Sequence, residues 1–104
     1  MATFAVTTAK GPGWDRTRGT REQAGWVEHA AYFDALVERG VVVLGGPIGS
    51  DDDEEVGLLL VEAANEGEVR AAFAADPWAK GGVLRIGSLR PWRLWLDGRR
   101  RPSH

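Results

Sequence analysis

The chain has 104 residues, of which 43% are hydrophobic and 27% charged, and its formal net charge is −2. This length and composition predict one globular domain, and the small net charge predicts no general attraction to nucleic acid or to anionic membranes. Because the sequence contains no cysteine, the chain can form no disulfide and can offer no thiolate to a substrate or a metal ion.

The first half of the chain predicts a strand, a long loop, a helix and a second strand. Alternating residues from Thr3 to Thr8 indicate the first strand. The glycine and proline residues of segment 10–19 interrupt helices and strands and so predict a loop. Loops of this length more often have a function than serve as simple connections. The sequence Thr20-Arg21-Glu22-Gln23 matches a capping box, which predicts a helix from there to about Arg39. The β-branched run 41–44 predicts the second strand.

One stripe of the predicted first helix is expected to face the core. Its members are spaced four, three and four residues apart, which places them on one side of a helix. They are Trp26, Ala30, Phe33 and Val37. Gly40 is the expected left-handed stop of this helix.

The second half of the chain predicts a connection, a strand, a helix and a last strand. The acidic run Asp51–Glu55 predicts a solvated hairpin connection, and the apolar segment Val56–Ala64 predicts a strand. Asn65 is expected to cap a helix that ends before Asp76. The last strand is predicted from Val83 to about Trp95. The buried stripe of this second helix is expected to be Val69, Ala72 and Phe73.

This order of elements predicts a ferredoxin-like α+β fold, with a βαββαβ order, a four-stranded antiparallel sheet and both helices on one face. The runs 41–44 and 58–61 are apolar at every position, which is typical of strands that are buried on both faces. No third long helix is predicted, so we expect the sheet of a second copy to cover the other face in a homodimer. Short chains also bury a smaller share of their surface, about 60 to 70% here, which favours association.

We expect one domain over residues 1–97 and a basic tail over residues 98–104. No internal repeat and no linker divides the first of these segments. The tail contains Arg99, Arg100 and Arg101, a cluster that more often marks a solvated end than a nucleic-acid site. We therefore expect no nucleic-acid partner.

Four segments, spread over nearly the whole domain, carry a resemblance to a known family. They are Glu28-His29-Ala30-Ala31-Tyr32-Phe33-Asp34-Ala35-Leu36, Gly40-Val41-Val42-Val43-Leu44-Gly45-Gly46-Pro47, Asp76-Pro77-Trp78 and Arg90-Pro91-Trp92. In these segments the chain resembles the YCII-related (YciI-like) family of small dimeric α+β barrel proteins. The resemblance implies a ferredoxin-like fold, a dimer, and a pocket in which His29 and Asp76 form a candidate catalytic pair.

His29 lies at the edge of the predicted stripe, three residues after Trp26 and four before Phe33. A histidine in this place is either a satisfied core residue or a general acid–base. Asp76 by itself can be an ordinary turn residue before proline. If its turn lies beside the first helix, Asp76 can accept a hydrogen bond from His29, set its tautomer and stabilise the imidazolium.

Four further residues are assigned to substrate binding: Trp14, Arg21, Pro47 and Trp78. The two tryptophans stand beside glycine or proline near element ends, where indole rings either wall a pocket for a flat ligand or close the edge of a small core. Arg21, at the predicted helix start, can orient an anionic ligand. Pro47 follows two glycines at the end of the second strand and is placed with this group.

Metal and nucleotide sites have no support in the sequence. The two histidines, His29 and His104, do not have the spacing of a metal site, and the acidic run 51–55 lacks the alternation and the glycine of a calcium loop. No phosphate loop and no Gly-x-Gly-x-x-Gly motif occurs. We therefore expect no metal and no other cofactor.

The amino-terminal residues 1–6 lack the basic start and the apolar core of a signal peptide. No apolar run approaches the roughly 20 residues of a membrane-spanning helix. We therefore expect a cytoplasmic protein without a membrane partner.

The leading hypothesis is a cofactor-independent enzyme of small-molecule metabolism, with His29 as general acid–base and Asp76 as its orienting partner. Elimination, isomerisation and hydrolysis all fit such a pair. One alternative is a binding or accessory module that holds a small molecule without converting it. The other is a structural dimerisation domain without a pocket, in which the two residues only stabilise the core.

Overall fold

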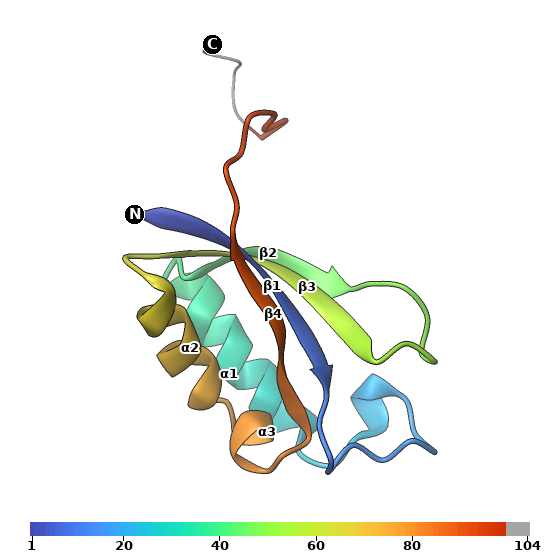
Figure 1. Ribbon diagram of the computed structural model, residues 1–104. Coiled ribbons are helices and arrows are strands. Elements are labelled where there is room, and N and C mark those ends of the chain that lie inside the picture. Colours follow the sequence, from blue (N-terminus) through green and yellow to red (C-terminus); the bar gives the residue numbers. More distant parts are fainter. Residues whose placement is uncertain (100–104) are drawn as a thin grey trace.

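The computed structural model describes residues 1–99, which form one four-stranded antiparallel sheet with its helices on one face (Figure 1). The strand order is β2-β3-β1-β4. Along the chain the elements are β1 (Ala2–Lys10), the 3-10 helix η1 (Thr20–Glu22), α1 (Trp26–Glu38), β2 (Val42–Pro47), β3 (Glu55–Ala63), α2 (Glu66–Ala74), α3 (Pro77–Lys80) and β4 (Leu84–Pro91).

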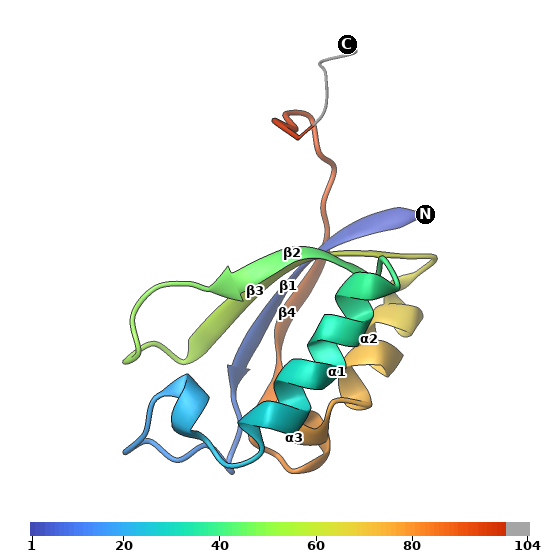
Figure 2. The same ribbon diagram turned by 180° about the vertical axis from the view of Figure 1, so that it is seen from behind.

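The predicted ferredoxin-like α+β fold is confirmed. The strands and the two long helices follow one another in the predicted order, and α1 and α2 lie together on one side of the sheet (Figures 1 and 2). The short helix α3, between α2 and β4, was not predicted. In the described part of the chain, no helix covers the opposite side of the sheet, which we call the outer face (Figure 2).

Strict alternation along β1 builds the core beneath the helices. Phe4 and Val6 are 4% and 0% exposed and point toward the helices, whereas Ala5 and Thr7 point to the outer face. The buried cluster around them consists of Phe4, Val6, Leu36, Val42, Val61, Ala63, Val69 and Phe73.

The predicted start of the first helix is wrong. Thr20 begins only the short helix η1, and α1 starts at Trp26, after Gly25 with a left-handed φ of 82°. The side chain of Gln23 does not complete a capping box, because its amide is bonded to the backbone of the preceding loop. A residue with positive φ interrupts the helical path, so the two segments cannot be one helix.

The predicted core stripe of α1 is turned by one position. Leu36 is fully buried at 0% exposure, whereas Val37 is 51% exposed. Trp26 packs in a second cluster with Trp14 and Trp78 at one end of the sheet, and not in the main core. The stripe that meets the main core therefore runs through Phe33 and Leu36.

The second half of the chain follows its prediction closely until the last strand. Asn65 Oδ1 accepts a hydrogen bond from the Glu68 backbone N–H at 2.9 Å, and this cap begins α2 as expected. β4 ends at Pro91 and does not continue to Trp95. One further ladder bond joins the Trp92 N–H to Thr3, and there the partner strand β1 also ends. A strand without a partner has no ladder to extend.

The acidic connection 51–55 is exposed, as predicted, but other segments hold it in place. The Lys10 ammonium donates to the Asp51 carbonyl at 2.6 Å, and Arg16 forms an ion pair with Glu54 at 2.7 Å. The long loop after β1 therefore lies against the connection between β2 and β3. Of the predicted basic tail 98–104, residues 100–104 lie outside the described part of the chain.

Candidate functional site

The His29 ring and the Asp76 carboxylate are in direct contact. Nδ1 of His29 lies 2.9 Å from Oδ2 and 3.0 Å from Oδ1 of Asp76. The two side chains are 13% and 3% exposed, so the pair is largely removed from water. A charge-assisted hydrogen bond gains strength in such surroundings, because fewer water molecules compete for its partners.

Helix α3 fixes the position of the Asp76 carboxylate. Asp76 is the N-cap of α3, and its Oδ1 accepts a hydrogen bond from the Trp78 backbone N–H at 3.2 Å. Pro77 occupies the first turn of that helix, where its missing N–H has no cost. The Asp-Pro-Trp sequence thus aims the carboxylate at α1.

Three aromatic rings surround the His29 imidazole. Trp78 stacks on it with ring centroids 4.0 Å apart and an interplanar angle of 9°. Phe33 and Trp26, on the same helix, lie at centroid distances of 5.0 Å and 5.8 Å. The Trp78 indole N–H donates to the Ala24 carbonyl at 2.8 Å, which ties the stacked ring to the segment just before α1. The imidazole is therefore held in one orientation.

The other nitrogen of the His29 ring, Nε2, points away from this carboxylate contact. Within residues 1–99 no hydrogen bond reaches Nε2, yet every side-chain nitrogen or oxygen that is shut off from solvent there has a partner. Nε2 is therefore accessible from outside. Because the carboxylate accepts from Nδ1, the neutral ring carries its proton on Nδ1 and presents a lone pair at Nε2.

A cavity of about 340 Å³ adjoins Asp76 at the open edge of β4. Its walls include Phe33, Phe73, Leu84 and Ile86, and Asp76 is part of its lining. Phe33 and Asp76 are also the neighbours of the His29 ring, so this cavity lies next to the pair. A volume of this size suits a small organic molecule.

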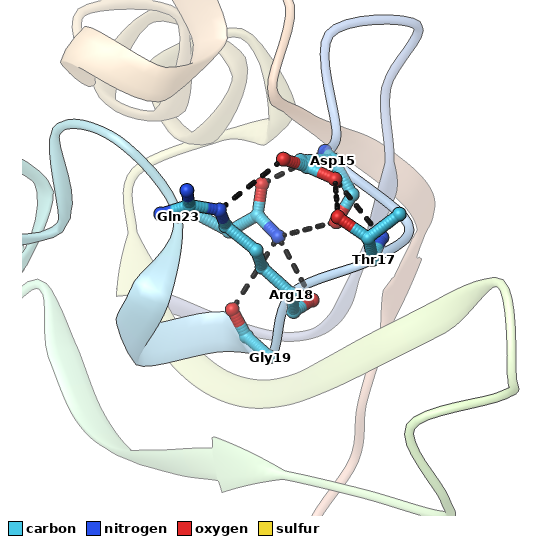
Figure 3. Close-up of polar contacts among 5 residues, drawn as sticks. All are labelled: Asp15, Thr17, Arg18, Gly19 and Gln23. Atoms are coloured by element: carbon cyan, nitrogen blue, oxygen red, sulfur yellow. Dashed lines mark hydrogen bonds and ion pairs between the residues drawn. The ribbon is translucent and has the colours of Figure 1, made fainter.

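The long loop before α1 is held by the buried side chain of Gln23 (Figure 3). Its Oε1 accepts from the Asp15 backbone N–H at 2.9 Å, and its Nε2 donates to the Asp15 carbonyl at 2.7 Å. Further bonds from Nε2 reach the carbonyls of Arg18 at 3.0 Å and Gly19 at 3.3 Å. Gln23 is only 4% exposed, and its one side chain supplies hydrogen-bond partners to several backbone groups of the loop.

Asp15 stabilises the same loop from its exposed side (Figure 3). The Thr17 hydroxyl donates to its carboxylate at 2.6 Å, and the Thr17 backbone N–H does so at 2.9 Å. These bonds, with a smaller contribution from Arg18, lower the pKa of Asp15 below its ordinary value of 3.8.

The four residues assigned to substrate binding occupy different places. Trp78 is 2% exposed and stacks on His29, while Trp14 is 7% exposed and meets Trp78 edge to face at 6.0 Å. Trp14 and Pro47 line a second cavity of about 220 Å³, between the long loop and the acidic connection. Arg21 is exposed, with its guanidinium 5.9 Å from the Trp26 ring centre.

Sequence reasoning assigned Trp26 and Phe33 to packing alone, although both contact His29. Their spacing of three and four residues from His29 was the signal for this contact, since such residues are neighbours on a helix. Lys10 was missed altogether: it is 8% exposed and lines the second cavity. Nothing in a strand pattern distinguishes a lysine that ends in a cavity from one that ends in solvent.

Residues 1–99 hold neither a cluster of metal-ligand side chains nor a helix that could span a membrane. Among them, no three side chains of the histidine, cysteine or carboxylate types are placed to hold a metal ion together. None of the described helices has the length and apolar character needed to cross a membrane.

The fold and the site define the class: a small ferredoxin-like α+β protein with a histidine–aspartate contact beside a cavity. The chain belongs to the YCII-related family, whose domain model matches residues 4–93. No curated protein matches the sequence.

A solved structure has a similar fold. It is 5-chloro-2-hydroxyhydroquinone dehydrochlorinase (TftG) from Burkholderia phenoliruptrix AC1100, in complex with 2,5-dihydroxybenzoquinone. The two chains share 24% identity with a TM-score of 0.60, over 93% of this chain and 96% of the other.

Proposed function

We propose that this protein is a cofactor-independent enzyme that moves a proton on a small molecule, with His29 as general acid–base and Asp76 as its orienting partner. The observation that carries the proposal is the contact of His29 Nδ1 with both carboxylate oxygens of Asp76, at 3.0 Å and 2.9 Å, which leaves Nε2 free. Membership of the YCII-related family and the fold of a dehydrochlorinase support it.

In the proposed mechanism, Nε2 of His29 takes a proton from the substrate and the ring becomes an imidazolium. Asp76 stabilises that charge through the Nδ1 hydrogen bond, and the π face of Trp78 stabilises it further. The proton then passes from Nε2 to a leaving group, to another substrate atom or to water. Positioned acid–base groups of this kind contribute about 10²- to 10⁴-fold to a rate.

Of the three reaction types that such a pair can perform, elimination has the most support. The structural neighbour is named as a dehydrochlorinase, and its solved complex holds a flat quinone ring. In the present chain, the cavity beside Asp76 has two phenylalanine walls, Phe33 and Phe73. Aromatic rings pack well against such walls, so we propose a flat cyclic substrate.

We further propose that the enzyme is a homodimer that buries the outer faces of two sheets. Leu44, Leu60 and Ala5 are direct cross-strand neighbours and form an apolar row over β2, β3 and β1 on that face. Leu44 is 49% exposed. Leu60 is already only 4% exposed, so Leu44 is the member of the row that gains most by packing on a second copy. A two-fold axis would make the two contacts equivalent.

The acid–base assignment is tested first through the tautomer of His29. Nitrogen-15 NMR of the imidazole distinguishes a proton on Nδ1 from one on Nε2, and His29→Asn assigns the signals against those of His104. We expect the Nδ1–H form in the wild type, and a shift toward the Nε2–H form in Asp76→Asn. The matched control is Asp34→Asn, an exposed carboxylate on the same helix. A neutral wild-type ring with its proton on Nε2 would overturn the assignment.

Turnover separates the enzyme from a binding module. Halogenated and hydroxylated quinols would be screened for halide release and for a change in absorbance, with binding followed by tryptophan fluorescence. For an active compound, His29→Asn is expected to lower kcat at least 100-fold while circular dichroism stays unchanged. If a compound binds in the cavity and the wild type and His29→Asn convert it at the same rate, the binding-module alternative replaces the enzyme.

A further inference from the structure

The chain after β4 leaves the domain as an arm, which we define as residues 92–99. In both views this segment extends away from the sheet and the helices (Figures 1 and 2). Trp92, Trp95 and Leu96 are 38%, 80% and 88% exposed. Three large apolar side chains within five positions form an exposed surface that solvent alone does not favour.

Hydrogen bonds give the arm a shape at both of its ends. At its base, the Trp92 N–H donates to the Thr3 carbonyl at 2.9 Å. At its tip, the Asp97 carboxylate accepts from the Arg99 backbone N–H at 3.0 Å and from its guanidinium at 2.9 Å and 2.8 Å. The exposed pair, Trp95 and Leu96, lies between the anchored base and this local turn.

The outer face of the sheet offers a matching apolar surface. Its row Leu44, Leu60 and Ala5 crosses three strands, with Leu44 49% exposed, Ala5 partly exposed and Leu60 already only 4% exposed in the single chain. The bond between Trp92 and Thr3 continues the ladder of β1 and β4, so alternation places Trp92 on the outer face next to this row. The arm thus begins at one end of the surface that a second copy would cover.

Charges on the arm and on the outer face are complementary. Arg93 lies in the arm, and Arg90 points to the outer face immediately before it. Arg99, in contrast, is paired with Asp97 and interacts with Glu62 of its own chain. The opposite charges stand on β3, where Glu55 and Glu62 alternate with the core residues. A face that carries both signs at separate places can pair with its own copy across a two-fold axis.

The length of the arm also fits a second copy. The five residues from Trp92 to Leu96 span at most about 18 Å when extended. A sheet of four strands is only about 15 Å wide between its outer strands. The arm points away from its own sheet in both views, and it is long enough to cross the sheet of another copy. Its tip stays near one end of β3, where Glu62 contributes to raising the pKa of Arg99.

We propose that residues 92–99 are an exchanged arm, which packs Trp95 and Leu96 on the outer sheet face of a second copy of this chain. The exchange is reciprocal, so that a dimer holds two such contacts. This inference rests on the homodimer of the proposed function, and it deepens that proposal by naming the segment that locks the two copies together.

The dimerisation test compares the wild type with the double variant Trp95→Ser/Leu96→Ser by sedimentation and light scattering over a range of concentrations. We expect the dimer dissociation constant to rise at least 10-fold, with unchanged circular dichroism. The matched control is Val27→Ser/Val37→Ser, which removes two apolar side chains of α1 that are 73% and 51% exposed. It should leave the constant within twofold.

Cross-linking tests the location, because a chain without cysteine allows single cysteines to be placed freely. Leu96→Cys chains would be mixed with Leu44→Cys or Leu58→Cys chains, whose cysteines stand on the outer face, or with Val37→Cys chains as control. We expect mixed disulfides with at least one of the outer-face positions, at five or more times the yield of the control.

The outcomes separate the arm from the rest of the proposal. The exchanged arm would be overturned if Trp95→Ser/Leu96→Ser left the dimer dissociation constant unchanged. It would also be overturned if outer-face cross-links were no more frequent than those of Val37→Cys. Either result would leave the sheet-face dimer standing. A wild type that stays monomeric at 100-micromolar concentrations, on the order of the weakest specific dimers, would overturn both. Neither result affects the tautomer of His29, which tests the catalytic pair on its own.

Discussion

The two faces of the sheet are built from the same strands but differ in how far they are buried. The face beneath the helices is closed, with Leu36, Val61 and Val69 at 0% exposure. The outer face leaves Leu44 49% exposed and is covered by no helix of residues 1–99. The covered face also holds the His29–Asp76 pair. A single chain therefore completes the His29–Asp76 contact, whereas in our proposal a second chain covers the outer face.

This difference shows how a small domain divides its apolar residues. Strand alternation sends half of the side chains of each strand to each face, whatever covers that face. The helices of this chain suffice for one face only. We propose that apolar residues on the other face serve association, because a small chain buries a smaller share of its surface within itself.

The largest expected difference between the two faces is in the free energy of unfolding. Leu36→Ala should lower it by about 3 kcal/mol, because it removes a buried side chain and leaves a cavity. Leu44→Ala, on the outer face, should cost less than about 1 kcal/mol in the monomer. Urea denaturation at several protein concentrations measures both.

Concentration sharpens that comparison. The effect of Leu44→Ala should grow with protein concentration if dimerisation buries this side chain, whereas the effect of Leu36→Ala should stay constant. Equal losses for the two variants at low concentration would contradict the division into a closed and an open face.

The covered side also depends on one polar side chain. Gln23→Ala removes four hydrogen bonds to the backbone of the long loop, and we expect a loss of about 2 kcal/mol in the free energy of unfolding. Hydrogen exchange of the amides of segment 14–24 should become faster, as measured by mass spectrometry. The neighbouring exposed variant Glu22→Ala serves as control. Unchanged exchange in Gln23→Ala would show that the loop is held by other contacts.

Polar contacts on the outer face should contribute less to the free energy of unfolding than the hydrogen bonds of Gln23. The Thr7 hydroxyl bonds to the Glu55 carboxylate and to the Ser88 hydroxyl, both at 2.7 Å. Thr7→Val breaks these bonds, but solvent can replace them in the monomer and valine suits a strand, so we expect a change of about 0.5 kcal/mol or less. Thermal unfolding of dilute protein measures it. A loss above about 1.5 kcal/mol would mean that the outer face is as tightly built as the covered one.

The smallest effect on stability is expected from loss of the exposed ion pair between Arg16 and Glu54. The Arg16 hydrogen bond lowers the pKa of Glu54 below its ordinary value of 4.5. A lowered pKa means that the stabilisation is present above about pH 4.5 and is lost as the pH falls through the lower folded-state value. The melting temperatures of the wild type and Glu54→Gln should therefore differ slightly at pH 7 and converge in acid. Asp52→Asn is the control. If the melting temperatures of the wild type and Glu54→Gln still differed at pH 2, the ionised Glu54 carboxylate would not be the cause of the difference.

Most of the fold could be predicted because its signals are local. Alternation defined β1, and the Asn65 cap with Val69 and Phe73 defined α2. The errors concern features that depend on distant parts of the chain. The capping box at Thr20 has the right letters, but its glutamine is bonded to the loop before it. The end of β4 depends on where β1 begins.

The candidate site could be predicted only through the family resemblance. His29 and Asp76 are 47 positions apart, and neither residue is distinctive by itself. Their contact follows from packing of the α2–α3 turn against α1. The stacking of Trp78 on His29 was not predicted at all, although Trp78 had been assigned to the site.

The sequence by itself determined the order of strands and helices, the apolar character of both sheet faces and the residue types available for acid–base chemistry, because periodicity and composition act over a few residues. Only the tertiary structure decided which nitrogen of His29 meets a carboxylate, which aromatic rings enclose it, and which apolar face remains open. These depend on distances between side chains far apart in the chain, which packing sets and no local pattern records.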